Sequence, residues 1–183
     1  MVDQDSGLGS DGSLSGSDLT IQLLTGSSAF AQFSRNEAAV VVGFMKPARF
    51  EAGTCFITEG DVTDTGFMAL VLQGEVIVEN LIVSRTAPIT TAVLGLGCLV
   101  GEIGLIDEGP RSASCIAGTD LYCAVLTREA FYSLIVKEPA LGAKLMLGVS
   151  VRIAERARET ARKLKIYAKL CQAMQAEINV LLR

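Results

Sequence analysis

The sequence contains no histidine among its 183 residues. This absence excludes His-ligated metal sites, Ser-His-Asp triads and Cys-His dyads, so any catalysis would depend on carboxylates or lysine. No pairing of a nucleophile with a base and no cluster of metal ligands is visible either. We therefore predict a protein that is not an enzyme, with no catalytic residues and no bound metal.

Long apolar runs and a secretory leader are also missing. Half of the residues are hydrophobic, yet runs such as 38–42 and 69–72 are far shorter than the roughly 18–20 residues of a membrane span. Residues 1–5 lack the basic start and apolar stretch of a secretory signal. The sequence predicts a cytoplasmic protein with a well-filled core and no membrane partner.

Cysteine pairs and basic charge are scarce as well. The five cysteines form an odd set without a CxxC pair, and most have apolar neighbours, which favours reduced, buried thiols over disulfides or zinc. The net charge is −4 and the pI about 4.9, which argues against a protein that coats nucleic acid.

The composition changes along the chain and predicts three regions. Residues 1–18 hold four aspartates, nine Gly or Ser residues and no Lys or Arg, as expected of a disordered acidic tail. Residues 19–138 form the main domain and begin with two short helices, of which Ser34 and Glu37 predict the second, over Arg35–Met45, through a capping box. Residues 139–183, opened by Pro139, form one long helix.

Between residues 48 and 125, short apolar or alternating runs are separated every few residues by glycine-bearing turns. Many short strands with such turns predict a compact roll or barrel. Thr127 then caps the start of a further helix.

The segment 101–114, GEIGLIDEGPRSAS, carries the chemistry. Its first residues are typical of a short helix bounded by glycines, whose free backbone N–H groups favour an anion. Arg111 follows Glu102 by nine residues, past a Gly-Pro turn that can return the chain to the same cavity. A guanidinium suits a phosphate, and a carboxylate suits a sugar hydroxyl.

This segment resembles the phosphate-binding cassette of the cyclic-nucleotide-binding domain family, which includes catabolite activator proteins and protein kinase A regulatory subunits. Two upstream segments, 50–61 and 68–78, resemble the family's paired early strands with their Gly-Asp and Gly-x-Val turns. The resemblance covers about residues 28–165. It implies an α+β fold: an antiparallel, jelly-roll-like β-roll (a double-stranded β-helix) with short flanking helices and a long C-terminal helix.

The resemblance also implies ligand-binding roles. Arg111 is similar to the arginine that clamps the cyclic phosphate, Glu102 to the carboxylate that accepts from the ribose 2′-hydroxyl, and Gly101 and Ile103 to the adjoining backbone contacts. Ser112 occupies the position after the arginine, where a hydroxyl can touch phosphate or a guanine-type base. Taken singly, these residues are also typical of a surface ion pair, turn glycines and a strand-edge hydroxyl.

The long helix carries an apolar stripe at alternating spacings of three and four: Leu164, Tyr167, Cys171, Met174, Ile178 and Leu181. This a/d pattern predicts a parallel homodimer, and the alternative is a helix that folds back onto the roll. The register extends backwards through Met146, Ser150, Ile153, Ala157 and Thr160.

Between residues 152 and 169, seven basic residues stand against two acidic ones. Such a run is typical of a solvated helix face. The resemblance also allows Arg156, or Arg152 one turn earlier, to stack on the bound base as a cap. The Thr-Ser pair with which catabolite activator proteins touch the base is replaced by Arg156 and Ala157, so the base stays open between cyclic AMP, cyclic GMP and cyclic di-GMP.

These features predict a regulatory sensor that binds cAMP or cGMP and signals through the C-terminal helix to an unknown effector protein. The alternative is a coiled-coil dimeric scaffold with a vestigial pocket. We expect no DNA partner, because no helix-turn-helix follows the long helix.

Overall fold

The first N-terminal helix begins earlier than the composition predicts. The computed structural model describes residues 15–26, 28–30, 32–63, 65–80, 89–107 and 109–181, so most of the predicted acidic tail, residues 1–14, lies outside the described residues. Helix α1 (Gly16–Gly26) includes the last three residues of that predicted tail. Ser15 caps it, because its hydroxyl oxygen accepts a hydrogen bond from the Asp18 N–H at 3.1 Å.

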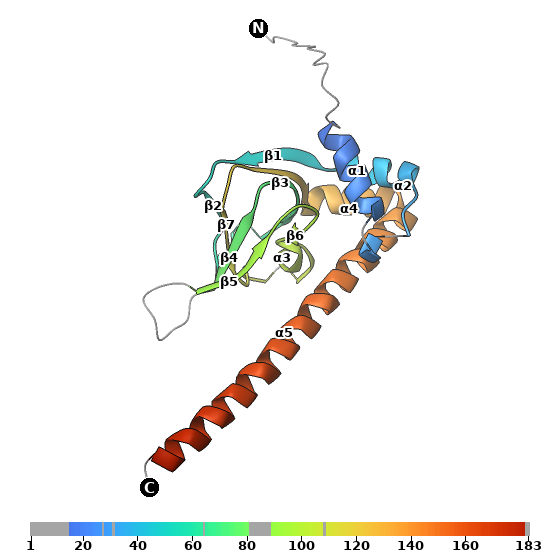
Figure 1. Cartoon of the computed structure of the whole chain (residues 1–183). Coiled ribbons are helices and arrows are strands. Elements are labelled where there is room, and N and C mark those ends of the chain that lie inside the picture. The colour runs from blue at the N-terminus through green and yellow to red at the C-terminus, as the bar shows by residue number, and fades with distance from the viewer. Residues whose placement is uncertain are drawn as a thin grey trace.

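The centre of the molecule is a roll of two four-stranded antiparallel sheets, with strand orders β1-β8-β3-β6 and β2-β7-β4-β5 (Figure 1). The strands are β1 (Lys46–Phe50), β2 (Cys55–Ile57), β3 (Phe67–Gln73), β4 (Val76–Asn80), β5 (Ile89–Leu94), β6 (Leu99–Val100), β7 (Ser114–Ala117) and β8 (Leu121–Thr127). The predicted fold class, a β-roll with short flanking helices and a long C-terminal helix, is confirmed.

The remaining helices are a 3₁₀ turn, η1 (Ser28–Phe30), and α2 (Arg35–Val42), α3 (Glu102–Asp107), α4 (Arg128–Lys137) and α5 (Pro139–Leu181). The capping box of Ser34 and Glu37 at α2 is confirmed. Helix α2 ends at Val42, three residues before the predicted end, because β1 starts at Lys46 and the residue before a proline favours an extended backbone.

Two apolar cores share the sheet β1-β8-β3-β6. Its inner face, with Ala69 and Val71, packs against the opposite sheet. Its outer face, with Met68 and Leu70, packs against the helices. Because both faces are covered, the sequence of β3 is a nearly continuous apolar run instead of an alternating one.

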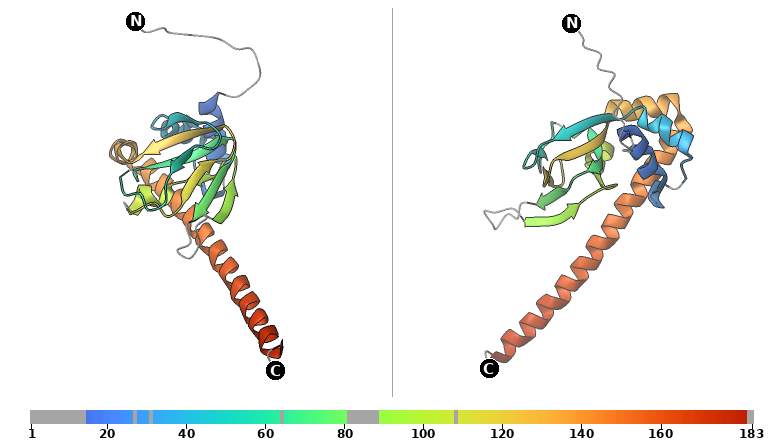
Figure 2. Two further views of the ribbon diagram at one scale, coloured as in Figure 1. Left: turned by 90° about the vertical axis from the view of Figure 1, so that its left-hand side faces the viewer. Right: turned by 45° about the horizontal axis from the view of Figure 1, so that its top comes forward.

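Helix α5 starts in the helical layer, passes the roll and extends well beyond it (Figures 1 and 2). One face of its first turns is buried as far as Val149, and Met146 and Ile153 pack against the helical core. Residues 155–181 are exposed, so the apolar stripe from Leu164 to Leu181 does not fold back onto the roll. Among the described residues, no helix is sufficiently long and apolar to cross a membrane.

Candidate functional site

The cassette, residues 101–114, begins where β6 ends. Gly101 turns the chain into α3 with a φ of +76°, a left-handed conformation that side chains disfavour. A Cβ at this position would lie 2.9 Å from both the Arg111 Nη1 and the Phe67 carbonyl oxygen. Glycine is therefore required twice, for the turn and for the close approach of the arginine.

Arg111 is held from both its backbone and its side chain. Its N–H donates to the Asp61 carbonyl (2.9 Å), and its own carbonyl accepts from the Gly60 N–H (2.8 Å), so the Gly-Asp turn noted in the sequence positions this residue. The side chain is buried, with 4% of the residue exposed. Its Nη1 donates to the carbonyls of Phe67 and Gly101, both at 3.0 Å, and the guanidinium carbon lies 4.4 Å from the centre of the Phe67 ring.

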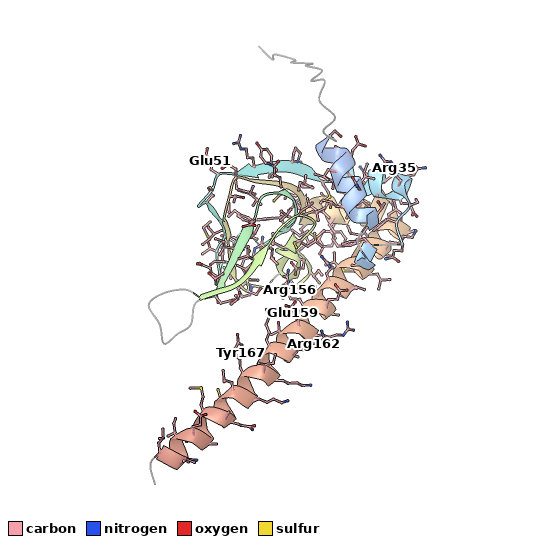
Figure 3. The ribbon with its side chains drawn as sticks, viewed as in Figure 1. Arg35, Glu51, Arg156, Glu159, Arg162 and Tyr167 are labelled. Atoms are coloured by element: carbon pink, nitrogen blue, oxygen red, sulfur yellow. The ribbon has the colours of Figure 1, made fainter. Side chains whose placement is uncertain are left out.

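Glu102 is also buried, with 2% of the residue exposed, and its partner comes from α5. The Arg156 Nη1 donates to the Glu102 Oε1 at 2.6 Å, while the Arg156 Nη2 donates to the Leu99 carbonyl at 3.1 Å. Figure 3 shows Arg156 where α5 passes the roll, with Arg162 and Tyr167 further along the helix. Arg156 thus joins the long helix to both β6 and α3.

Two further side chains hold the cassette, and the sequence analysis missed both. The Arg128 Nη2, at the start of α4, donates to the Gly104 carbonyl at 2.6 Å. The Asn80 Nδ2, at the end of β4, donates to the Ser112 carbonyl at 2.8 Å. Neither carries a sequence signal, because each contact depends on how distant elements pack.

One cavity of about 50 Å³ brings together all six residues predicted for the ligand site, Gly101, Glu102, Ile103, Arg111, Ser112 and Arg156. Most of its other walls are apolar, supplied by Ile57, Val78, Leu94, Val100, Ala113 and Cys115. Ligand pockets usually measure roughly 300–1,000 Å³, so this cavity is smaller than a usual ligand pocket in the observed conformation.

A second cavity, of about 190 Å³, lies beside the first, between the end of β5, β6 and α5. It is lined by Leu94, Cys98, Leu99, Glu102, Arg152, Glu155, Arg156 and Glu159. The two cavities share Leu94, Glu102 and Arg156. The ion pair between Glu102 and Arg156 therefore stands at their common wall.

The charges at the cassette suit an anion. Three arginines, Arg111, Arg128 and Arg156, donate to backbone or side-chain oxygens of residues 101–104. Burial raises the pKa of the Cys115 thiol to about 11, so it stays protonated at neutral pH and is a poor nucleophile. The described residues contain no group of three or more metal-ligating side chains. Arginines in such a cluster have the chemistry to bind an anion such as a phosphate.

Comparison with known proteins agrees with this chemistry. The family model of the cyclic nucleotide-binding domain matches residues 47–138, and the chain belongs to this family of regulatory domains. It resembles the cyclic AMP receptor protein of Thermus thermophilus, with 29% identity over 132 residues. That match covers 72% of this chain and 60% of the relative, so the chain spans less than two thirds of that protein.

Solved structures show the same fold. A cyclic nucleotide-binding domain from Methylobacillus flagellatus superposes with a TM-score of 0.73 and 31% identity, over 80% of this chain and 81% of that one. The regulatory domain of Toxoplasma gondii PKA, crystallised with cAMP, superposes with a TM-score of 0.57 and 26% identity. This second match covers 64% of this chain and 43% of the other.

Proposed function

We propose that this protein binds a cyclic nucleotide, cAMP or cGMP, at the cassette, and that binding is transmitted through α5. The observation that carries the proposal is the burial of two opposite charges, Arg111 and Glu102, in one cavity of mostly apolar walls. An arginine and a carboxylate that line one cavity match the two polar groups of a cyclic nucleotide, its cyclic phosphate and its ribose hydroxyl. The name of the Thermus relative and the cAMP in the Toxoplasma structure support a cyclic nucleotide as the ligand.

The proposed roles follow the position of each residue. Arg111 binds the cyclic phosphate, Gly101 and Ile103 contribute backbone contacts, and Glu102 accepts from the ribose 2′-hydroxyl. Ser112 is exposed at the cavity rim, where its hydroxyl can reach the phosphate or the base.

Calorimetric titration with cAMP, cGMP and cyclic di-GMP tests this function. Arg111→Ala should weaken binding by about 1.5–3 kcal/mol for each charge-assisted bond lost, which is about tenfold or more. Arg49→Ala is the matched control, because Arg49 pairs with Asp120 on the exposed surface of the roll. Equal nucleotide affinities of Arg111→Ala and Arg49→Ala would show that the cassette does not bind the nucleotide.

A second function, a dimeric scaffold with a vestigial pocket, has one specific observation in its favour. The Arg111 Nη1 already donates to two backbone carbonyls, and the cavity in front of it is only about 50 Å³. This alternative predicts that none of the three nucleotides binds, while the protein still self-associates.

Both functions include a parallel homodimer through α5. The stripe residues Leu164, Tyr167, Met174, Ile178 and Leu181 are 45–84% exposed in the single chain, so burying them in a second copy removes much apolar surface from water. The basic residues around Arg158 and Arg162 then remain as solvated charge.

A further inference from the structure

The contacts of Arg156 differ from those of a base cap. The sequence resemblance predicts a guanidinium that stacks on the ligand, whereas in the structure both of its terminal nitrogens are engaged, with Glu102 and with the Leu99 carbonyl. Its partner carboxylate is buried and is the same group that the proposed function assigns to the ribose 2′-hydroxyl. A ligand hydroxyl and Arg156 therefore approach the same carboxylate, and Arg156 donates to its Oε1 in the observed conformation.

We propose that the ion pair of Arg156 with Glu102 closes the empty site, and that a cyclic nucleotide opens this pair and puts its 2′-hydroxyl in the place of Arg156 at Glu102. This inference rests on the proposed function. Cavity geometry supports it independently of the hydrogen bonds: the ion pair lies at the common wall of the 50 Å³ and 190 Å³ cavities. Neither cavity alone reaches the roughly 300 Å³ of the smallest usual ligand pockets, but the two joined would approach it.

Displacement also explains why the ligand's sugar matters for α5. A ligand shifts a conformational equilibrium only by its difference in affinity for the two states. A nucleotide with a 2′-hydroxyl satisfies Glu102 itself and frees Arg156, so it releases the contact between α5 and α3. A 2′-deoxy nucleotide offers Glu102 no donor, and opening the pair would leave a buried charge without a partner, which is costly.

The test compares cAMP with its 2′-deoxy analogue by calorimetry in the unmutated protein, Arg156→Ala and Arg158→Ala. In the unmutated protein both nucleotides must open the ion pair, but only cAMP gives Glu102 a new donor, so cAMP should bind about tenfold or more tightly than its analogue. In Arg156→Ala no ion pair has to be opened, so both nucleotides should bind about threefold or more tightly than they bind the unmutated protein. Arg158 is the matched control, because it is exposed two residues further along α5.

Three outcomes overturn the inference in distinguishable ways. If Arg156→Ala binds both nucleotides more weakly with an unchanged ratio, Arg156 is a base cap. If the unmutated protein binds cAMP and each nucleotide binds all three proteins with the same affinity, the displacement fails while the proposed function stands. If neither the unmutated protein nor Arg156→Ala binds either nucleotide, the proposed function fails and the inference with it.

A second measurement needs no ligand. Hydrogen exchange of residues 150–160 should be faster in Arg156→Ala and in Glu102→Gln than in Arg158→Ala, because only the first two lose the ion pair. Glu102→Gln keeps the shape of the side chain, so it separates loss of charge from loss of packing. Equal exchange in all three variants would show that the pair does not anchor α5 and would overturn the inference.

Discussion

Gly148 offers a direct test of how α5 docks beside the roll. This residue is the tenth of the 43 residues of α5 and is buried against the ring of Phe30, which is 2% exposed. A Cβ added at Gly148 would overlap the Cδ1 and Cε1 atoms of that ring and would lie 3.0 Å from the Ala29 carbonyl oxygen. Because the ring is enclosed by the helical core, it cannot move aside freely.

Two opposing effects determine the result of Gly148→Ala. Inside a helix, alanine is more favourable than glycine by about 1 kcal/mol, because it loses less backbone entropy on folding. Overfilling a packed core costs about 1–3 kcal/mol, and sometimes more. Because the overlap is severe and falls on an aromatic ring, we expect the second effect to prevail, with a net loss of about 1–2 kcal/mol in the free energy of unfolding and a fall of a few degrees in Tm.

Thermal and urea denaturation measure the effect, and two variants make it specific. Ser150→Ala, at an exposed position two residues further along the same helix, should be neutral or slightly stabilising. Phe30→Leu should be destabilising alone but should cost less in the Gly148→Ala background, because a smaller side chain relieves the overlap. A Tm for Gly148→Ala equal to or above that of the unmutated protein would refute the docking geometry.

Two further predictions concern assembly and pH. Leu164→Asp together with Ile178→Asp should convert the dimer to a monomer, because burying carboxylates in an apolar dimer interface is energetically costly. Light scattering measures the mass of both proteins, and a monomeric unmutated protein would contradict the proposed dimer. The hydrogen bond from Lys144, and those from Ser34, lower the pKa of Glu37 from 4.5 to about 2. Because the folded-state pKa is depressed, the stability that Glu37 contributes is full above pH 4.5 and is lost as the pH falls toward 2. The difference in Tm between the unmutated protein and Glu37→Gln should therefore shrink between pH 4.5 and 2 and stay constant above pH 4.5.

The sequence predicted those parts of the molecule that depend on local chemistry. The capping box of Ser34 and Glu37 and the short helix after Gly101 follow from neighbouring residues, and both occur in the structure. The order and pairing of the strands did not follow from the sequence, which indicated strands and turns but not which strands are neighbours. The long helix was predicted over residues 139–183, and α5 covers Pro139–Leu181, which is as far as the described residues reach.

The site shows where local reasoning ends. The resemblance named six residues that line one cavity, yet it assigned Arg156 a different contact from the one observed. The position of its guanidinium depends on the docking of α5 through Gly148 and Phe30, far along the chain from Glu102. Arg128 and Asn80 were missed for the same reason, because their partners are backbone carbonyls that only the tertiary fold brings near.

The exposed half of α5 makes the helix a mechanical lever. From Arg156 to Leu181 it is about 38 Å long, so a tilt of about 10° around the ion pair would move the far end by about 7 Å. A change of one hydrogen-bond partner at Glu102 is a much smaller movement than this. A change of contact at Glu102 that tilted α5 would therefore move the C-terminal end of the helix by more than the pitch of one helical turn. This end carries the surface that would contact a second chain.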